Sequence, residues 1–381
     1  MSVPFLDLRA QYGGLREELD AAVARVVHDQ RFILGPEVEG LEEEVAAYLG
    51  VPRAVGCASG TDALLLSLRA LGLEPGAEVV VPAFTFFATA GAVWNAGLKP
   101  VFADVDEDSL NLTAASMEAV LTERTRAVIV VHLYGRMADM DPILALCRER
   151  GIAVIEDAAQ AFGARGAVGT RYESAGTVGD IGCLSFFPTK ILGCYGDAGM
   201  VVTSDDLLAE RVAKLRVHGG RQMYHHEMVG TNSRLDALQA AVLRTKLPRV
   251  DRWIEQRAAV ADRYMEALAE APVTLPPPPP SMGGRDVHNV FTVKVEERDS
   301  VRAGLEARGV ASQVYYPVPL HLQACFASLG YGPGVFPVSE RAAELVLSLP
   351  IYPEMPVTDV DAVVTALLDA AVPTSGAQHH R

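Results

Sequence analysis

The apolar residues in the first two thirds of the chain follow two different spacings. Short apolar runs rich in β-branched residues predict strands, and between them apolar residues recur at helical spacing. The predicted strands cover residues 79–81, 101–105, 127–131, 153–155 and 200–203, and helices are predicted at 15–26, 38–49, 61–71 and 141–150. Strands that alternate with helices favour right-handed crossovers and a mostly parallel sheet with helices on both faces. We therefore predict a large α/β domain over residues 1–250.

The remaining residues, 251–381, predict a smaller α+β domain that a long helix joins to the first. The amphipathic stretch from 234 to about 268 contains Pro248, where we expect a bend because proline cannot donate a helical hydrogen bond. The prolines at 276–280 are typical of a stiff connector. Beyond them the pattern predicts strands at 287–295 and 313–316, and helices at 300–308, after Val338 and after Thr358. The polar tail at 374–381 is expected to be frayed.

Composition and charge exclude several classes of protein. The 381 residues are half hydrophobic and 21% charged, which fits a folded chain with a sizeable core. No apolar run approaches the ~18 residues that span a bilayer, and the N-terminus lacks the basic and apolar regions of a secretory signal. A net charge of −15 argues against nucleic acid as a partner, since such a surface repels phosphate backbones. The cysteines lack metal-binding spacing, so we expect reduced thiols, no metal site and a cytoplasmic protein.

Two motifs that follow predicted strands suit the binding of a phosphate and of a cation. Ser59-Gly60-Thr61 opens a helix, where free backbone N–H groups and hydroxyls form a phosphate cradle. An ordinary Ser/Thr helix cap explains the same residues. Asp157, in EDAAQ at 156–160, follows a strand, and polar groups at that place point into the ligand crevice of an open α/β sheet. Its alternative role is to cap the next helical turn.

Two further motifs contain cationic side chains. In SFFPTK at 185–190, Lys190 lies between apolar residues and a glycine-rich loop. Desolvation there lowers the pKa of an amine and makes it nucleophilic enough to form a Schiff base, although a surface lysine beside a turn is the alternative. The loop at 230–236 places Asn232 and Arg234 ahead of a helix, which suits oxyanion recognition. On its own, that loop is explained better as a capped helix start with a solvated arginine.

Together the four motifs supply what pyridoxal 5′-phosphate (PLP) requires. The cofactor has an aldehyde for a lysine, a phosphate for the cradle, and a pyridine nitrogen that Asp157 would keep protonated. Phe86 offers a ring that could stack on the cofactor, although the apolar pattern by itself favours Phe86 as a core residue. The sequence therefore predicts a PLP enzyme.

From residue 5 to about residue 353, the chain resembles the DegT/DnrJ/EryC1/StrS family of PLP-dependent nucleotide-sugar aminotransferases. The resemblance rests on SGTDAL at 59–64, EDAAQ at 156–160, SFFPTK at 185–190, HG at 218–219 and NSRLDALQAA at 232–241. It implies the aspartate-aminotransferase type I fold, with a large mostly parallel-sheet domain and a small C-terminal α+β domain. It also implies a homodimer whose active sites are shared between subunits.

The resemblance assigns roles to individual residues. Lys190 is similar to the family's Schiff-base lysine and proton shuttle, and Asp157 is similar to its pyridinium partner. Gln160 resembles the residue near the ring hydroxyl of the cofactor. The implied phosphate contacts are Gly60, Thr61 and Ser185, together with Asn232 from the neighbouring subunit.

The implied reaction transfers an amino group from L-glutamate to a keto group of a UDP- or dTDP-linked sugar. LGCYGD at 192–197 and YHH at 224–226 resemble the subgroup that aminates C3 of UDP-2-acetamido-3-keto-glucuronic acid. For that substrate we expect Arg234 to bind the C6 carboxylate or, alternatively, to brace its loop. Tyr315 and Tyr316 are expected to offer hydrogen bonds to sugar hydroxyls. The subgroup tends to carry His-Tyr-Pro where Tyr315 begins Tyr-Tyr-Pro here, so a dTDP-3-keto-6-deoxyhexose is the alternative substrate.

Two other activities compete with transamination. The PLP-dependent sugar dehydratases of this family replace the imine lysine with histidine, so Lys190 favours an aminotransferase. A PLP-binding regulator without turnover is the alternative from another class, and the complete catalytic set argues against it.

Overall fold

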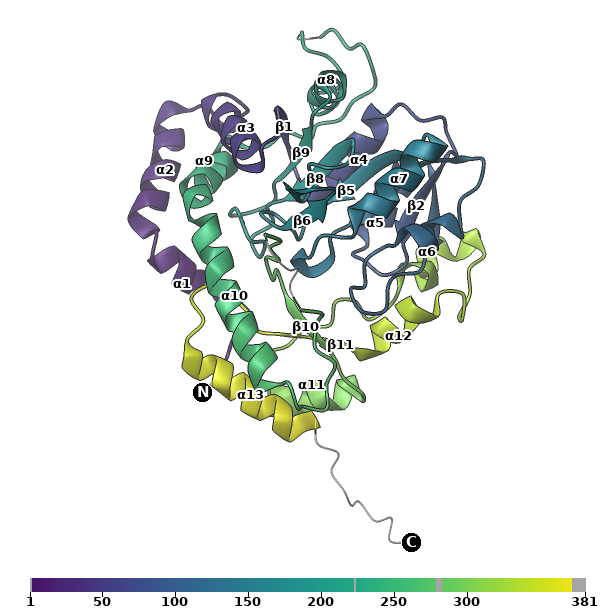
Figure 1. Ribbon diagram of the computed structural model, residues 1–381. Coiled ribbons are helices and arrows are strands. Elements are labelled where there is room, and N and C mark those ends of the chain that lie inside the picture. Colours follow the sequence, from purple (N-terminus) through teal and green to yellow (C-terminus); the bar gives the residue numbers. More distant parts are fainter. Residues whose placement is uncertain (1, 223, 279–282, 372–381) are drawn as a thin grey trace.

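The computed structural model describes residues 2–222, 224–278 and 283–371 and centres on a seven-stranded sheet (Figure 1). In spatial order its strands are β1 (Arg53–Cys57), β9 (Gly199–Thr203), β8 (Ile181–Ser185), β5 (Ala153–Asp157), β4 (Thr125–Val131), β2 (Glu78–Pro82) and β3 (Lys99–Ala103). The pairings are parallel except those that β9 makes with β1 and β8. The predicted mostly parallel sheet is confirmed, and the carboxyl ends of its parallel strands meet at one edge.

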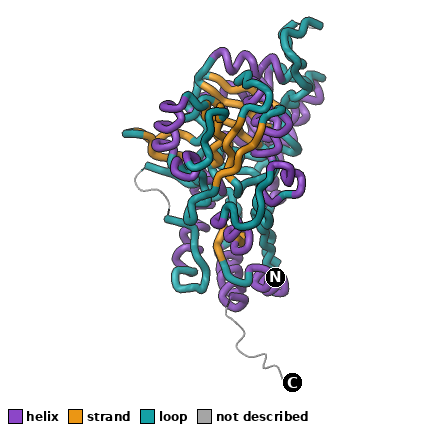
Figure 2. The backbone as a smooth tube through the Cα atoms, turned by 90° about the vertical axis from the view of Figure 1, so that its right-hand side faces the viewer, coloured by secondary structure: helices purple, strands orange, loops and turns teal. Residues whose placement is uncertain are grey.

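Helices cover both faces of this sheet because strand residues alternate between the faces. Val79 and Val81 of β2 pack with α4 (Gly60–Ala70) and α5 (Ala88–Asn95), whereas Val80 packs with α7 (Met140–Arg150). In Figure 2 the strands lie between layers of helices. The other helices of this part are α1 (Leu8–Gly13), α2 (Arg16–Asp29), α3 (Pro36–Leu49), α6 (Ala114–Glu118), α8 (Asp206–Leu215) and α9 (Ala237–Lys246).

The C-terminal part is built around a separate antiparallel pair of strands. Strand β10 (Phe291–Lys294) pairs with β11 (Val346–Leu349), and helices pack against the pair. Those helices are α10 (Val250–Ala267), α11 (Arg298–Ala307), α12 (Pro337–Leu345) and α13 (Val357–Ala371). Figure 1 shows α11 and α13 beside the far end of α10. This part has its own hydrophobic core, as a small α+β unit requires.

Helix α10 belongs to both cores. We call the region around the seven-stranded sheet the large part, and the region around β10 and β11 the small part. The first turns of α10 contribute Trp253 and Ile254 to the core of the large part, whereas Tyr264 lies in the core of the small part. The N-terminus also packs on the small part, where the Val3 N–H donates to the Gly309 carbonyl at 2.8 Å. A domain boundary at residue 250 stays a prediction, because α10 connects the two parts without a break.

Several predicted elements differ from the observed ones. The bend at Pro248 is confirmed, since α9 ends at Lys246 and α10 begins at Val250. The strand predicted at 313–316 is wrong, because only a single bridge from Gln313 to Ser348 forms there. The partner of β10 is instead β11, which follows α12 directly. Two predictions, for residues 279–280 of the proline run and for the tail at 374–381, lie outside the described residues.

The remaining strands form a hairpin away from the main sheet, β6 (Arg165–Val168) and β7 (Arg171–Ser174). Within the residues that the structure describes, none of the helices is both long enough and apolar enough to cross a membrane.

Candidate active site

A cavity of about 460 Å³ lies at the carboxyl edge of the large sheet and extends to the small part. Most of the residues that the sequence singled out line it together: Gly60, Thr61, Phe86, Asp157, Gln160, Ser185, Lys190, Tyr315 and Tyr316. Asn232 and Arg234 do not line it. The edge position is expected, because ligands bind at the carboxyl ends of strands in open α/β sheets.

The start of α4 forms one end of the cavity. The Ser59 hydroxyl caps the helix by accepting a hydrogen bond from the Asp62 N–H at 3.1 Å. Gly60 lies so close to the end of β8 that an added Cβ would stand 2.7 Å from Cβ of Ser185. Only glycine therefore allows the Ser185 hydroxyl to approach the free N–H groups at the helix start. Free N–H groups at a helix start beside a hydroxyl suit an anion, and the phosphate contacts expected of Gly60, Thr61 and Ser185 stay predictions.

Asp157 ends strand β5 as a buried carboxylate. It accepts hydrogen bonds from the Thr89 hydroxyl at 2.9 Å and from the Ala159 N–H at 3.2 Å. Burial raises the pKa of Asp157, while these hydrogen bonds and the charge of Lys190 act in the opposite direction. A buried carboxylate that faces a cavity is suited to hold a cationic group. Thr89 was missed by the sequence analysis, although it stands only three residues after Phe86.

Lys190 lies in the loop that follows β8 and is half-buried. Burial lowers the pKa of its amine to about 8, against the opposing effect of the Asp157 charge. The loop is held in place because the Lys190 N–H donates to the Phe187 carbonyl at 2.9 Å. Gly193 lets the chain fold back on itself, since an added Cβ would stand 2.4 Å from the Pro188 carbonyl oxygen. The alternative of a surface lysine beside a turn is wrong.

Glu156 precedes Asp157 in β5 but points to the opposite face. His132 Nε2 donates to Glu156 at 2.7 Å, and the Ala138 N–H donates to His132 Nδ1 at 3.1 Å, which fixes the tautomer of the ring. Backbone N–H groups of residues 176, 178 and 179 also donate to Glu156. These bonds hold the pKa of Glu156 below its usual range although burial acts to raise it. Glu156 therefore braces the sheet and is not free for a ligand.

Gln160 connects the large part to the small part beside the cavity. Its Nε2 donates to the Tyr316 hydroxyl at 2.9 Å, and its Oε1 accepts from the Tyr134 N–H at 2.8 Å. The Tyr134 hydroxyl donates to the Tyr315 carbonyl. The Phe86 ring lies 5.9 Å from the Tyr316 ring and is 54% exposed, so the alternative of Phe86 as a core residue is wrong.

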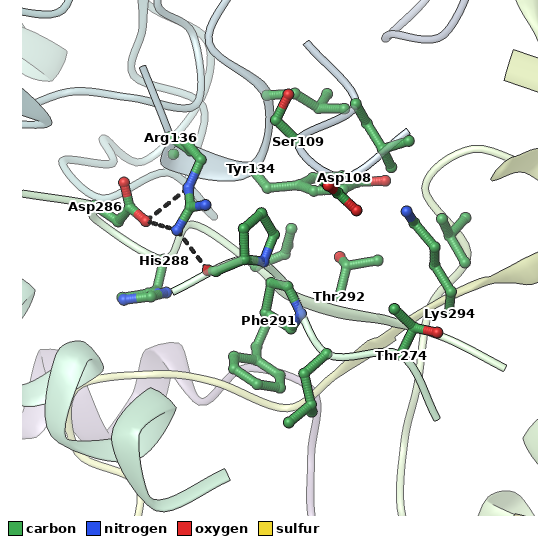
Figure 3. Close-up of a pocket in the computed structure, with 18 residues that line it drawn as sticks. Asp108, Ser109, Tyr134, Arg136, Thr274, Asp286, His288, Phe291, Thr292 and Lys294 are labelled. Carbon is green, nitrogen blue, oxygen red and sulfur yellow. Dashed lines mark hydrogen bonds and ion pairs between the residues drawn. The ribbon is translucent and has the colours of Figure 1, made fainter. Parts of the chain in front are cut away.

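A second cavity, of only about 60 Å³, lies between the two parts on the other side of Tyr134 (Figure 3). Arg136 and Asp286 pair directly at one side of it, with Arg136 Nε donating to the Asp286 carboxylate at 2.8 Å. Burial, together with the nearby guanidinium groups of Arg136 and Arg257, lowers the pKa of His288 to about 4. At about 60 Å³ this cavity offers little room for a ligand, and its two facing charged groups, Arg136 and Asp286, already neutralise each other.

Asn232 and Arg234 lie in a segment that runs past the start of α4. Between them, the Ser233 hydroxyl donates to the Asp62 carboxylate at 2.7 Å and accepts from the Ala58 N–H at 3.3 Å. Asn232 is exposed, and Arg234 is half-buried without a side-chain hydrogen bond or ion pair to any described residue. The predicted contacts of both residues therefore stay predictions that need a second subunit.

Two further polar residues line the cavity from the small part and were missed by the sequence analysis. Arg257 belongs to α10, and Asn289 precedes β10. Arg257 Nε and Asn289 Oδ1 are buried and have no hydrogen-bond partner. The sequence held one signal: the buried residues Val250, Trp253, Ile254, Arg257, Val260, Ala261 and Tyr264 follow helical spacing, and Arg257 is the charged one.

Over most of its length, the chain is similar to known aminotransferases. The DegT/DnrJ/EryC1/StrS aminotransferase family model matches residues 14–368. The chain is 48% identical to the pleiotropic regulatory protein of Geobacillus stearothermophilus, over 93% of this chain and 95% of that protein. It is 46% identical to the UDP-N-acetyl-3-dehydro-alpha-D-glucosamine 3-aminotransferase of Acidithiobacillus ferrooxidans, over 96% and 97%.

A third relative and a solved structure come from Streptomyces venezuelae. The dTDP-3-amino-3,4,6-trideoxy-alpha-D-glucose transaminase of that organism is 48% identical, over 93% of this chain and 92% of that protein. The crystal structure of S. venezuelae DesV in complex with a ketimine intermediate gives a TM-score of 0.93 at 46% identity, covering 97% of this chain and 99% of that one.

Proposed function

This chain belongs to the DegT/DnrJ/EryC1/StrS aminotransferase family, and we propose that it moves the amino group of L-glutamate to C3 of its sugar substrate. It is a PLP-dependent sugar aminotransferase that acts on nucleotide-linked keto sugars. One observation carries the assignment of the site. The Lys190 amine, with its lowered pKa, shares a cavity with the buried Asp157 carboxylate and with the anion cradle at Gly60 and Ser185.

The residues of the cavity fit the cofactor. The start of α4, with Gly60, Thr61 and the Ser185 hydroxyl, would hold the phosphate, since a Cβ at Gly60 would fill the cradle. The Asp157 carboxylate would accept a hydrogen bond from the ring nitrogen and keep it protonated, which also relieves the cost of burying that carboxylate. PLP supplies the electron sink for the charge that develops when the amino donor loses its Cα proton.

Lys190 has two tasks in this proposal. Its Nζ would hold the cofactor through a C=N bond and, once released, would move the proton at Cα of the donor. Both tasks need the neutral amine, and a pKa of about 8 leaves roughly a tenth of the amine neutral at pH 7. Phe86 would cover one face of the ring, and Gln160 would approach the ring hydroxyl while Tyr316 orients its amide.

We propose UDP-2-acetamido-3-keto-uronic acid as the sugar, with a dTDP-3-keto-6-deoxyhexose as the alternative. The names of two relatives, one for a UDP sugar and one for a dTDP sugar, share an amino group at C3, which supports that position for the ketone. Their identities to this chain, 46% and 48%, do not separate the nucleotides. The uronate depends on Arg234, which would reach the cavity of a second subunit together with Asn232.

Turnover of the two sugars by wild type and Arg234→Lys tests this proposal. If Arg234 binds a C6 carboxylate, the variant should lose about 1.5–3 kcal/mol of transition-state stabilisation on the uronate, because lysine lacks the planar fork. It should lose almost nothing on the neutral sugar. We would compare kcat/KM for both substrates. A wild type that prefers the neutral sugar, or equal losses on both, would reject the uronate in favour of the dTDP sugar.

One relative bears the name of a regulatory protein, so a PLP-binding regulator is kept as the alternative from another class. A regulator without turnover has no need for a lysine of lowered pKa beside a buried acid. Transfer of ¹⁵N from labelled glutamate to the sugar would support the enzyme, and cofactor binding without transfer to any 3-keto sugar would support the regulator.

A further inference from the structure

Arg257 is a buried cation that forms no ion pair with any residue that the structure describes. Its side chain is 3% exposed, and Nη1 donates to the carbonyls of Ile351 at 2.9 Å and His288 at 3.2 Å. Nε has no partner, and among the described residues Arg257 forms no ion pair. A buried guanidinium that meets only two carbonyls is incompletely compensated, because burying a charge is costly unless an opposite charge pairs with it.

The unpaired edge of Arg257 is the edge that binds carboxylates. With Nη1 occupied, Nε and Nη2 remain, and these two N–H donors form the planar fork that meets both oxygens of a carboxylate. Burial lowers the pKa of Arg257 to about 10, which Glu354 partly opposes through its charge, so the group stays cationic at neutral pH. Among the described residues, no carboxylate lies close enough to form an ion pair with Arg257.

Arg257 lines the same cavity as Lys190. Among the described residues around this cavity, these two carry the positive charge, and apolar residues such as Leu6, Val290 and Ile351 also line it. Asn289, whose Oδ1 is also buried without a partner, lines the cavity too. A cavity lined by a cation, apolar side chains and a polar amide is suited to a small acid with a short hydrocarbon chain.

We propose that Arg257 binds a carboxylate of the amino donor, an inference that rests on the proposed aminotransferase function. Any amino-acid donor carries a carboxylate on the carbon that bears the reacting amine, and glutamate carries a second one two methylenes further on. The sugars named for the relatives differ, and the trideoxyglucose among them has no carboxylate, so a cation within the subunit's own cavity matches the donor better than the sugar.

Equilibrium binding of glutarate tests the inference without turnover. Glutarate has the two carboxylates and carbon chain of glutamate but no amine, so it cannot react. In the holoenzyme, Arg257→Lys keeps the charge but loses the fork, and we expect the Kd of glutarate from calorimetry to rise roughly 10- to 100-fold. An unchanged Kd would overturn the proposal.

Arg298→Lys is the matched control. Arg298 is likewise buried in the small part, and its Nη1 donates to the carbonyls of Ala343 at 3.2 Å and Val346 at 3.1 Å. It does not line the active-site cavity. A loss of packing alone would affect both variants, so a comparable rise in the Kd of glutarate in Arg298→Lys would overturn the proposal.

Donor analogues identify which carboxylate is bound. We would follow the single-turnover conversion of the bound cofactor to its amine form with L-glutamate, 4-aminobutanoate and L-2-aminobutanoate. The second donor lacks the α-carboxylate and the third lacks the side-chain carboxylate. A contact to the α-carboxylate predicts that the defect of Arg257→Lys persists with L-2-aminobutanoate and disappears with 4-aminobutanoate; a contact to the other carboxylate predicts the reverse.

The single-turnover rates with the three donors are compared within one variant. Reduced stability of Arg257→Lys affects all three rates alike and therefore cancels from their ratios. Equal defects on all three donors, or a defect confined to the half-reaction with the keto sugar, would overturn the proposal. A wild type that takes no amino group from glutamate would refute the proposed function instead. Normal wild-type transfer with an unimpaired Arg257→Lys would refute only the role of Arg257.

Discussion

The two walls of the active-site cavity are built in different ways. On the wall from the large part, Gly60, Asp157 and Lys190 lie at or just beyond the ends of β1, β5 and β8, which the sheet holds at one edge. On the opposite wall, Arg257 comes from a helix, and Tyr316 comes from a segment without regular structure. The two walls therefore divide their tasks: the sheet fixes the reacting groups, and the less regular wall selects what reaches them.

Hydrogen bonds beside the cavity hold its two walls in place relative to each other. Gln160 bonds to the Tyr316 hydroxyl at 2.9 Å, and the Asn289 N–H donates to the Tyr134 carbonyl at 2.9 Å. The small part is therefore positioned directly by residues that follow β4 and β5. If the division of labour is correct, changes on the sheet wall should affect the reaction with every substrate, whereas changes opposite should depend on the substrate.

The largest effect is expected from Lys190→Ala. The variant should lose the visible absorbance of the bound cofactor and both half-reactions, because one amine both holds the cofactor and moves the proton. Absorbance spectra and single-turnover assays with each substrate would measure this. Retained colour together with activity would contradict the assignment of Lys190 and remove the central residue of the sheet wall.

Asp157→Asn should still bind the cofactor but lose turnover by ~100-fold or more, since a neutral amide cannot keep the ring nitrogen protonated. The matched control is Glu156→Gln on the neighbouring position of β5. Glu156 is fully paired on the opposite face, so this change should lower the free energy of unfolding and leave kcat of the folded enzyme nearly unchanged. Equal losses of kcat in both variants would mean that the acid acts through the sheet and not at the cavity.

The lowered pKa of Lys190 predicts the pH dependence of cofactor loading. Only the neutral amine forms the C=N bond, so the rate at which PLP-free protein reacts with added PLP should rise about tenfold from pH 7 to pH 9 and then level off around a pKa of about 8. A lysine with the ordinary pKa of ~10.4 would instead show a rise of nearly 100-fold over that range. Stopped-flow absorbance would distinguish the two curves.

A mixed dimer tests whether the partner subunit contributes residues to the active-site cavity. Asn232 is exposed and lies outside its own subunit's cavity, so Lys190→Ala and Asn232→Ala protomers should complement each other. Each heterodimer would hold one intact site and one with both defects, and random mixing should restore roughly a quarter of wild-type activity. Refolding the two inactive proteins together would measure it. Heterodimers that form but stay inactive would place the Asn232 contact within its own subunit.

Much of this molecule could be predicted from local patterns in the chain. The alternation of β-branched runs and helical spacing predicted the parallel sheet, and proline chemistry predicted the break at Pro248. Short motifs around Gly60, Asp157 and Lys190 identified the sheet wall, because residues at and just after a strand's carboxyl end are adjacent in sequence as well as in space. The second wall was found less completely, since Arg257 and Asn289 come from separate elements of the small part.

The elements, and the chemistry that each motif carries, follow from local patterns in the chain. Which of these groups meet depends on the tertiary structure. The strand predicted at 313–316 fails because β10 pairs instead with β11 after α12, and no local spacing records that choice of partner. Likewise, the helical spacing of buried residues in α10 places Arg257 on an apolar face. Only the packing of that helix against the rest of the protein makes Arg257 part of a cavity wall and leaves its Nε without a partner. Periodicity acts over a few residues, whereas burial and pairing are set by contacts between segments far apart in the chain.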